Sequence, residues 1–272
     1  MTPIATVRAS SWPALFDCPH RWYWQNIVGL KSAWSGAALL GTAVHAGTGI
    51  FDTRRLNGEA ASIEEAVDVS RAALLEKQGE VEWDDKLDVK SADGLSIALT
   101  ARYCETIAPT RQYAAVELAC ESLDIATDHG TVRITGTTDR IRVLPDGGMG
   151  IADLKTGGRA TEKTPDGGRR AVTKGHHLQL GIYTLMAEAA SGERLDAPAE
   201  IIGLQTTKDA PVATGEVADV KTPLLGTDEA PGIIEIAAGM LKSGVFPPNC
   251  RSVLCSARYC AAHAQGKCIY HD

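Results

Sequence analysis

The chain has 272 residues, of which 44% are apolar and 5% aromatic, and its formal net charge is −7. This length predicts one large domain, or one domain that carries a helical insertion. The negative charge argues against a protein that wraps duplex DNA over a wide surface, but it is compatible with a narrow basic channel. No apolar run reaches the roughly 18–20 residues that span a bilayer, and the N-terminus lacks the apolar core of a signal peptide. We therefore expect a cytoplasmic protein without membrane contact.

Helices dominate the first part of the chain. Residues 9–26 predict a short helix with a heavy aromatic load. Residues 36–56 predict a second helix, rich in small side chains, with His45 in its middle. Taken alone, a helical histidine among Ala and Gly is more often a packed residue than a ligand. Residues 61–78 and 91–108 predict amphipathic helices, which we expect to form a subdomain beside a sheet.

From residue 114 the pattern changes to alternating apolar and polar side chains. The segments 114–125, 131–144 and 149–155 predict three strands, and a Pro-Asp-Gly-Gly turn at 145–148 joins the last two. Together they predict an antiparallel meander. Further along, we predict a mobile loop at 156–175, a helix at 176–191, a strand at 199–207, an irregular stretch at 209–230 and a helix at 232–244.

Two aspartates and a lysine fall on neighbouring predicted strands. Asp139 lies near the end of one strand, and Asp153 and Lys155 lie two residues apart on the next. Side chains at positions i and i+2 of a strand share a face, so the turn between the strands can bring all three together. Paired carboxylates suit Mg²⁺ or Mn²⁺, which polarise a phosphodiester and activate water. On its own, however, an Asp-x-Lys pair is common and is seldom catalytic.

The motifs around these residues resemble a known family. They are Gly136-Thr-Thr-Asp139-Arg140, Ala152-Asp-Leu-Lys-Thr-Gly157 and Gln179-Leu-x-x-Tyr183. In this order they resemble the PD-(D/E)XK nuclease superfamily, and specifically its RecB-like branch with an iron–sulfur cluster, which includes AddB, CRISPR-associated single-strand exonucleases and phage exonucleases. The resemblance implies an α/β (α+β) fold with a restriction-endonuclease-like core, in which a central mixed sheet is flanked by helices. It also implies a bacterial or phage-infected host cell.

The resemblance implies a role for each matching residue. Asp139 and Asp153 match the two metal-binding acids, and Lys155 matches the catalytic lysine. Gln179 and Tyr183 match a helical motif that helps to hold DNA and order the site. Because they are four residues apart, they share one helix face.

Two further positions match metal-site residues of the family. His45, in Gly41-Thr-Ala-Val-His45, matches a metal-ligating histidine of the RecB-like branch, which overrides its reading as a packed residue. Glu117 matches an acid that often precedes the first core strand. The sequence departs from the family at Thr138, where proline often stands. A histidine ligand shifts the expected preference from Mg²⁺ toward Mn²⁺.

Cysteines crowd the end of the chain. Cys255, Cys260 and Cys268 have the spacing C-x4-C-x7-C, and such thiolates in a reducing compartment bind zinc or an iron–sulfur cluster. The fourth ligand is either Cys250, in a local set suited to zinc, or the distant Cys18. In iron–sulfur members of the RecB-like branch, one cysteine precedes the nuclease core and three follow it. The resemblance therefore implies a 4Fe–4S cluster on Cys18, Cys255, Cys260 and Cys268.

Basic side chains gather in the predicted loop after the acidic motif. Between residues 155 and 174 there are six basic residues against two acids, which suits a nucleic-acid strand, although a merely solvated loop is the alternative. The candidate DNA-binding residues are Arg159, Lys163, Arg169, Arg170 and Lys174.

The leading hypothesis is a metal-dependent DNA exonuclease that acts on single strands or strand ends in repair, recombination or phage or CRISPR DNA processing. A helicase, recombination or CRISPR protein is the partner that such an enzyme would use. The alternatives are a structure-specific endonuclease with the same site and a non-catalytic, cluster-stabilised DNA-binding subunit. The expected organisation is an N-terminal helix with the cluster cysteine at 1–35, a helical subdomain with the metal-ligating histidine at 36–112, the nuclease core at 113–245 and a C-terminal cysteine cluster region at 246–272.

Overall fold

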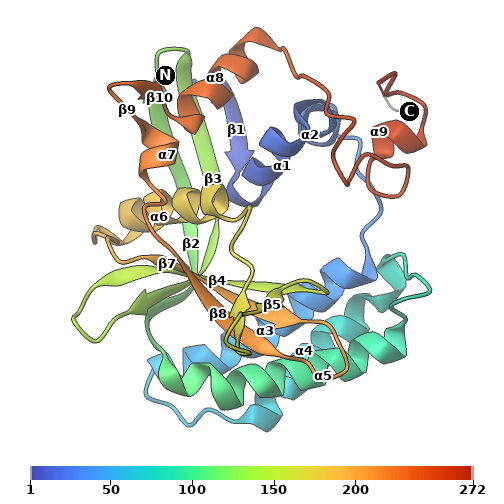
Figure 1. The fold of residues 1–272 in the computed structure, drawn as a ribbon, viewed down its shortest axis with the longest axis vertical. Helices are drawn as coiled ribbons and strands as arrows, with labels where there is room; N and C mark the ends of the chain where they lie inside the picture. The colour runs from blue at the N-terminus through green and yellow to red at the C-terminus, as the bar shows by residue number, and fades with distance from the viewer. Residues whose placement is uncertain (1, 271–272) are drawn as a thin grey trace.

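The computed structural model describes residues 2–270 and shows a central mixed sheet between two layers of helices (Figure 1). This is the α/β fold that the sequence predicts. The sheet has the order β1-β3-β4-β7-β8, and β2 pairs with β3 outside this path. Its strands are β1 (Ala5–Arg8), β2 (Gln112–Thr127), β3 (Gly130–Val143), β4 (Met149–Gly157), β7 (Ala199–Gln205) and β8 (Val212–Val217).

The predicted meander is confirmed, since β2 pairs antiparallel with β3 and β3 pairs antiparallel with β4. Strand β4 then runs parallel to β7, and the helix α6 (His177–Ser191) forms the crossover between them. The pairing of β3 with β4 covers only the register from Val143↔Met149 to Arg140↔Ala152. Beyond it, β3 continues beside β2 and β1, and β4 continues beside β7. The sheet therefore forks next to the two predicted aspartates.

Three helices cover one face of the sheet, as predicted for the helical segments. They are α3 (Gly36–Leu56), α4 (Ile63–Lys77) and α5 (Val89–Thr106). Each begins at a capping side chain, because Ser35, Ser62 and Asp88 each accept a hydrogen bond from a backbone N–H of the first turn. Their apolar sides pack with Leu154 and Ile202 of the sheet into one core.

The other face of the sheet carries a second core. Here α6, the N-terminal helices and α8 (Ile233–Ser243) pack against the sheet. Ile151 and Ile201 point to this side, whereas Leu154 and Ile202 point to the other, as the alternation of side chains along a strand requires. Alternate residues of β4 and β7 are therefore buried against different helix layers.

The prediction of a continuous helix at 9–26 is wrong. The segment forms a 3-10 turn η1 (Ala9–Ser11) and two helices, α1 (Trp12–Asp17) and α2 (Pro19–Asn26). The break lies at Cys18, whose backbone is extended because Pro19 disfavours a helical residue before it. Strand β1 was also not predicted; its four residues are too few to show a period, and they pair parallel with β3.

Two segments without predicted structure also contain strands. The expected mobile loop at 156–175 contains the hairpin β5 (Thr161–Lys163) and β6 (Arg169–Ala171), and the expected irregular stretch at 209–230 contains β8. The hairpin packs closely on the sheet, where Gly203 and Gly215 leave room for its backbone. Short elements complete the fold: η2 (Gln78–Glu80), η3 (Ala108–Thr110), α7 (Thr222–Leu225), β9 (Gly226–Thr227), β10 (Ala230–Pro231) and α9 (Ala261–Ala264).

Among the helices of residues 2–270, none combines the length and the apolar character needed to cross a bilayer.

Close packing at Gly203 predicts a measurable effect on stability. A methyl group there would overlap the carbonyl oxygen of Ala160, at the base of the hairpin. We expect Gly203→Ala to lower the free energy of unfolding by about 1–3 kcal/mol, measured by denaturant unfolding. Gly157→Ala is the matched control, because a methyl group there meets open space. Equal unfolding midpoints for the two variants would show that the hairpin does not pack on Gly203.

Candidate active site and cysteine pocket

Three potential metal ligands meet at the fork of the sheet. His45 comes from the middle of α3, Glu117 from β2 and Asp139 from β3. One ligand atom from each lies within 4.8 Å of the others. Glu117 is exposed, His45 is half-buried and Asp139 is buried, so the group opens to solvent on one side. An imidazole with two carboxylates is a donor set that suits Mn²⁺ or Mg²⁺.

The peptide groups of Leu154 orient two of these ligands. The Leu154 N–H donates to Oδ2 of Asp139 at 2.9 Å, and the Leu154 carbonyl oxygen lies 3.1 Å from Nε2 of His45. We therefore place a proton on Nε2, which leaves Nδ1 without one in the neutral ring. Nδ1 faces Oδ2 of Asp139 at 3.5 Å. The lone pairs of Nδ1 and Oδ2 therefore face each other, and a cation between these two atoms would stabilise the arrangement.

Asp153 lies beside this group, at the same fork. Its carboxylate is 1% exposed and forms an ion pair with Nζ of Lys155 at 2.5 Å. Burial raises the pKa of Asp153 to about 6, although Lys155 opposes the rise; the neighbouring Asp139 adds to it. A bound cation would stabilise the ionised form of this carboxylate, because its positive charge offsets the loss of solvation on burial.

Helix α6 covers the buried end of the site. Nε2 of Gln179 donates to the hydroxyl of Tyr183 at 2.9 Å, and both side chains are buried. Burial raises the pKa of Tyr183, and the carboxylates of Asp153 and Asp139 raise it further. Just before the helix, burial and the charge of Lys155 lower the pKa of His176 to about 4, so its imidazole is neutral near pH 7.

Arg140 connects the acidic group to the helical layer behind it. Its side chain is completely buried, and its Nε donates to Oδ2 of Asp52 at 2.8 Å. Its Nη1 donates to Oε1 of Glu117 at 3.0 Å and to the carbonyl oxygen of Asp139 at 2.8 Å. Glu117 has a left-handed backbone, with φ 50, inside a strand. Such strain persists only where surrounding contacts hold it, and Arg140 provides one of them.

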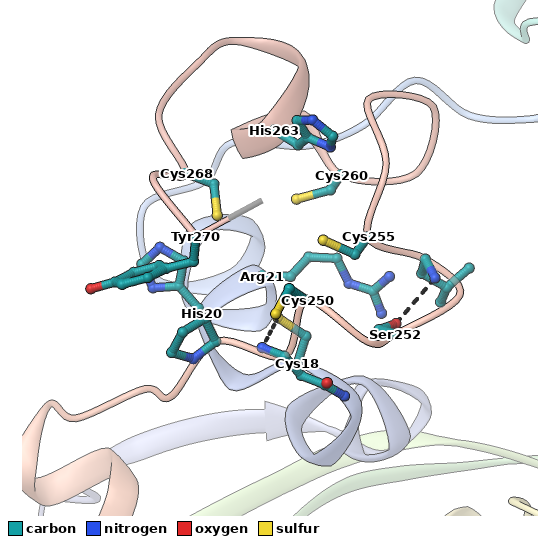
Figure 2. A pocket seen from close by; sticks show the side chains of 13 residues that line it. Cys18, His20, Arg21, Cys250, Ser252, Cys255, Cys260, His263, Cys268 and Tyr270 are labelled. Carbon is teal, nitrogen blue, oxygen red and sulfur yellow. Dashed lines mark hydrogen bonds between the residues drawn. The ribbon is translucent and has the colours of Figure 1, made fainter. Parts of the chain in front are cut away.

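Five cysteines line a pocket between α2 and the C-terminal tail (Figure 2). They are Cys18, Cys250, Cys255, Cys260 and Cys268. Burial raises the pKa of the Cys255 thiol, and the sulfurs of Cys18, Cys268, Cys260 and Cys250 raise it further, in this order of strength. Mutually repelling thiolates at one place suit a cationic metal centre, either zinc or an iron–sulfur cluster. Within the described chain all five are free thiols.

Hydrogen bonds join the tail to the residues around Cys18. The N–H of Asn249 donates to Sγ of Cys18 at 3.4 Å, across 231 residues of sequence. The Asn249 side chain donates to the carbonyl oxygen of Asp17, and the hydroxyl of Ser252 donates to the Asp17 carboxylate. The tail therefore brings its cysteines to Cys18 through polar contacts. The side chain of Cys250 is exposed, unlike those of the other four cysteines.

Comparison with known proteins supports the sequence motifs. The model of the PD-(D/E)XK nuclease superfamily matches residues 9–265. The chain belongs to this superfamily. The RecB-like branch and its iron–sulfur cluster remain predictions, because the match extends to the superfamily alone.

One solved structure shows the same fold. A protein from Eubacterium rectale, named provisionally as an exonuclease, has a TM-score of 0.56 and 16% identity, over 91% of this chain and 86% of that chain. At this identity the likeness shows the fold alone. The crystal structure of SSO0001 covers 97% of this chain and 85% of its own, with 14% identity and a TM-score of 0.43. Comparison with curated proteins gives no match.

The predicted DNA-binding residues of this nuclease lie on and around the hairpin. Arg170 pairs with Glu162 across the two strands at 2.7 Å, and Arg169 donates to the hydroxyl of Thr161. All five candidate side chains are exposed: Arg159, Lys163, Arg169, Arg170 and Lys174. The hairpin is held on the sheet that carries Lys155, so these charges have a defined place instead of moving with a loop.

Sequence reasoning assigned no role to two residues of the site. Arg140 belongs to the motif Gly136-Thr-Thr-Asp139-Arg140, but a charged residue on a strand gives no sign that it will be fully buried. His176 begins a predicted helix, and only the structure shows that the charge of Lys155 acts on its imidazole. The side chains predicted for the active site come from five separate elements, and the structure brings them together at the fork: His45, Glu117, Asp139, Asp153, Lys155, Gln179 and Tyr183.

Burial of Asp153 predicts the pH dependence of stability in the metal-free protein. Since its pKa rises from 3.8 to about 6, the folded chain binds this proton more tightly than the unfolded chain. The free energy of unfolding should therefore fall as the pH rises from about 4 to about 6. We expect Asp153→Asn, a neutral isostere, to be more stable than wild type at pH 8 by about 2–3 kcal/mol.

The measurement is denaturant unfolding with a chelator of divalent ions, at several pH values. The gap between Asp153→Asn and wild type should narrow as the pH falls from 6 toward 4. Asp146→Asn, on an exposed turn, is the control and should show no such gap. A wild-type protein more stable than Asp153→Asn at pH 8 without metal would contradict the expected charge penalty.

Proposed function

We propose that the protein is a metal-dependent DNA exonuclease that acts on single strands or strand ends. The observation that carries this proposal is the meeting of His45, Glu117 and Asp139 at the fork, beside the buried pair of Asp153 and Lys155. Membership in the nuclease superfamily supports hydrolysis of phosphodiester bonds. We assign the metal ligands as His45, Asp139, Asp153 and Glu117. A bound Mg²⁺ or Mn²⁺ would neutralise charge on the phosphodiester and lower the pKa of water.

The residues of the chain have distinct roles in this scheme. Lys155 lies 2.5 Å from Asp153 in the absence of substrate, and its ammonium group is placed to steady an attacking hydroxide and a phosphate oxygen. Gln179 and Tyr183 bond to each other and confine the buried side of the site. Leu154 keeps Asp139 and His45 in place through its peptide groups, so little reorganisation is needed when substrate binds.

Basic side chains provide the path for DNA. The hairpin presents Arg159, Lys163 and their neighbours to solvent near Lys155, whereas the chain as a whole has a net charge of −7. A narrow basic track on an acidic protein suits one strand better than a wrapped duplex, because each neutralised phosphate requires its own cation. This is the observation that favours single strands or frayed ends.

We further propose a 4Fe–4S cluster on Cys18, Cys255, Cys260 and Cys268. Four cysteines of the pocket are at least partly buried, and Cys250 alone has an exposed side chain. The N–H of Asn249 donates to Sγ of Cys18, as donors commonly do to the ligand sulfurs of iron–sulfur clusters. The proposed ligands lie near both ends of the chain, so the free energy of metal binding would stabilise the folded position of the tail.

The central test is cleavage of labelled linear single-stranded DNA with Mg²⁺ or Mn²⁺. We expect Asp153→Ala and Lys155→Ala each to lower the cleavage rate by at least about 100-fold, because each removes charge stabilisation at the reacting phosphate. Lys174→Ala, an exposed position, is the matched control and should weaken binding by a small factor only. Wild-type rates in a clean preparation of Lys155→Ala would contradict the proposal.

A circular single strand separates the exonuclease from its alternatives. An exonuclease leaves the circle intact, whereas a structure-specific endonuclease with the same ligands opens it. If the protein does not bind Mn²⁺ and releases no product from either substrate, it is a non-catalytic DNA-binding subunit. Linear and circular forms of one sequence make the comparison independent of base preference.

The cluster is tested by anaerobic purification with iron and sulfide analysis and a visible spectrum. We expect Cys18→Ala to lose iron, because it removes a partly buried ligand on which the tail docks, and Cys250→Ala to keep the wild-type iron content. If Cys18→Ala keeps its iron and Cys250→Ala loses it, the fourth ligand is Cys250 instead of Cys18. Stoichiometric zinc without sulfide would replace the cluster with a zinc site.

A further inference from the structure

One wall of the cysteine pocket contains a buried arginine with an unused donor. The side chain of Arg21 is 7% exposed and runs past Cys255 toward Ser252 (Figure 2). Its Nη2 pairs with Oδ2 of Asp17 at 3.2 Å. Its Nε is buried and has no hydrogen-bond acceptor among the described residues. A buried N–H without an acceptor is destabilising, so its presence in this wall indicates a missing acceptor.

We propose that Arg21 is the cationic partner of the anionic group that the cysteines hold, and that its Nε–H faces a sulfur acceptor of that group. This inference rests on the metal centre proposed above and concerns a residue outside its ligand set. Arg21 lies in the first turn of α2, directly after the extended residue Cys18, and both side chains line the pocket. Thiolate ligands leave a bound cluster anionic, and a buried guanidinium opposes that charge without screening by water.

Asp17 moderates the charge of Arg21. Its carboxylate accepts from the guanidinium and from the hydroxyl of Ser252, and it is about one third exposed. The cation therefore acts on the pocket as part of an ion pair, of which Arg21 lines the pocket and Asp17 does not. Removing either member of the pair changes the field in the pocket, and the two removals change it in opposite directions.

This arrangement has a consequence for reduction. One-electron reduction of a cluster adds a negative charge and breaks no bond, so a cation nearby stabilises the reduced form and raises the reduction potential. Loss of the positive charge of Arg21 should therefore lower the potential. Loss of the negative charge of Asp17 should raise it. If Arg21 and Asp17 served only to hold the tail in place, their removal would not shift the reduction potential in opposite directions.

The experiment is an anaerobic titration of the purified holoprotein with dithionite, followed by visible absorption and electron paramagnetic resonance. The variants are Arg21→Gln and Asp17→Asn, with Arg21→Lys as a charge-conserving variant in case Arg21→Gln folds poorly. Arg251→Gln is the matched control, because it removes one exposed positive charge from the same tail. Iron and sulfide are counted for each protein before titration.

We expect the potential of Arg21→Gln to be more negative than wild type, that of Asp17→Asn to be more positive, and those of Arg21→Lys and Arg251→Gln to change little. Unchanged potentials in Arg21→Gln and Asp17→Asn at full iron content would overturn the role of Arg21 and leave the cluster standing. If the wild-type protein holds zinc, the rate of zinc release to a chelator is measured instead. Equal rates for wild type and Arg21→Gln would then overturn the inference. A wild-type protein with no metal overturns both proposals.

Discussion

The divergence of β3 from β4 is the constraint on which the site depends. Past the pair Arg140↔Ala152 the two strands separate, and the peptide of Leu154 no longer lies against a neighbouring strand on the β3 side. Its N–H is taken by Asp139 and its carbonyl oxygen by His45. Buried peptide groups need partners, so the hydrogen bonds that satisfy the peptide of Leu154 at the fork also orient Asp139 and His45, the proposed metal ligands. The sheet and the site are therefore one structural feature.

Most charged side chains at the fork form ion pairs, and one carboxylate, that of Asp139, has no lysine or arginine partner among the described residues. Arg140 is shared by Asp52 and Glu117, and Lys155 is paired with Asp153. Asp139 has a backbone donor and an imidazole but no cationic side chain of its own within ion-pair distance among the described residues. Buried ion pairs contribute more to defined geometry than to net stability, because desolvation offsets much of their attraction. Their placement here leaves the carboxylate of Asp139 without a lysine or arginine partner among the described residues, beside the imidazole of His45.

Much of the molecule could be predicted from local sequence patterns, and the failures have physical reasons. Long periodic segments such as α3 and the meander gave clear signals, because their period and turn residues are set by neighbours in sequence. The four residues of β1 and three-residue strands of the hairpin contain too few positions to show a period. Their structure comes from pairing with distant strands and from the space that Gly203 leaves, which no local pattern encodes.

The candidate site shows the same division. Motif spacing predicts that Asp139, Asp153 and Lys155 meet, since strand alternation and a tight turn bring them together, whereas their proposed roles come from the resemblance to the family. The pairing of Nε2 of His45 with Leu154, and the burial of Arg140, depend on how α3 packs on the sheet. Packing of this kind is decided by the tertiary structure, so local pattern alone predicts neither the partner of His45 nor the burial of Arg140, and His45 is singled out only through the resemblance to the family.

The cysteine pocket and the acidic site are held by different kinds of contact. Strand β1 and the helices after it belong to the main core, through Val7, Trp12 and Leu15, so Cys18 is carried by the same sheet as Asp139. The tail, by contrast, exposes Val253 and Ile269, and it docks through hydrogen bonds to Asp17 and Cys18 together with a few ring contacts to α2. A segment with few buried apolar contacts opens more easily than a sheet. Loss of the proposed cluster should therefore release the tail first, while Asp139 and His45 keep their positions because the peptide of Leu154 still holds them.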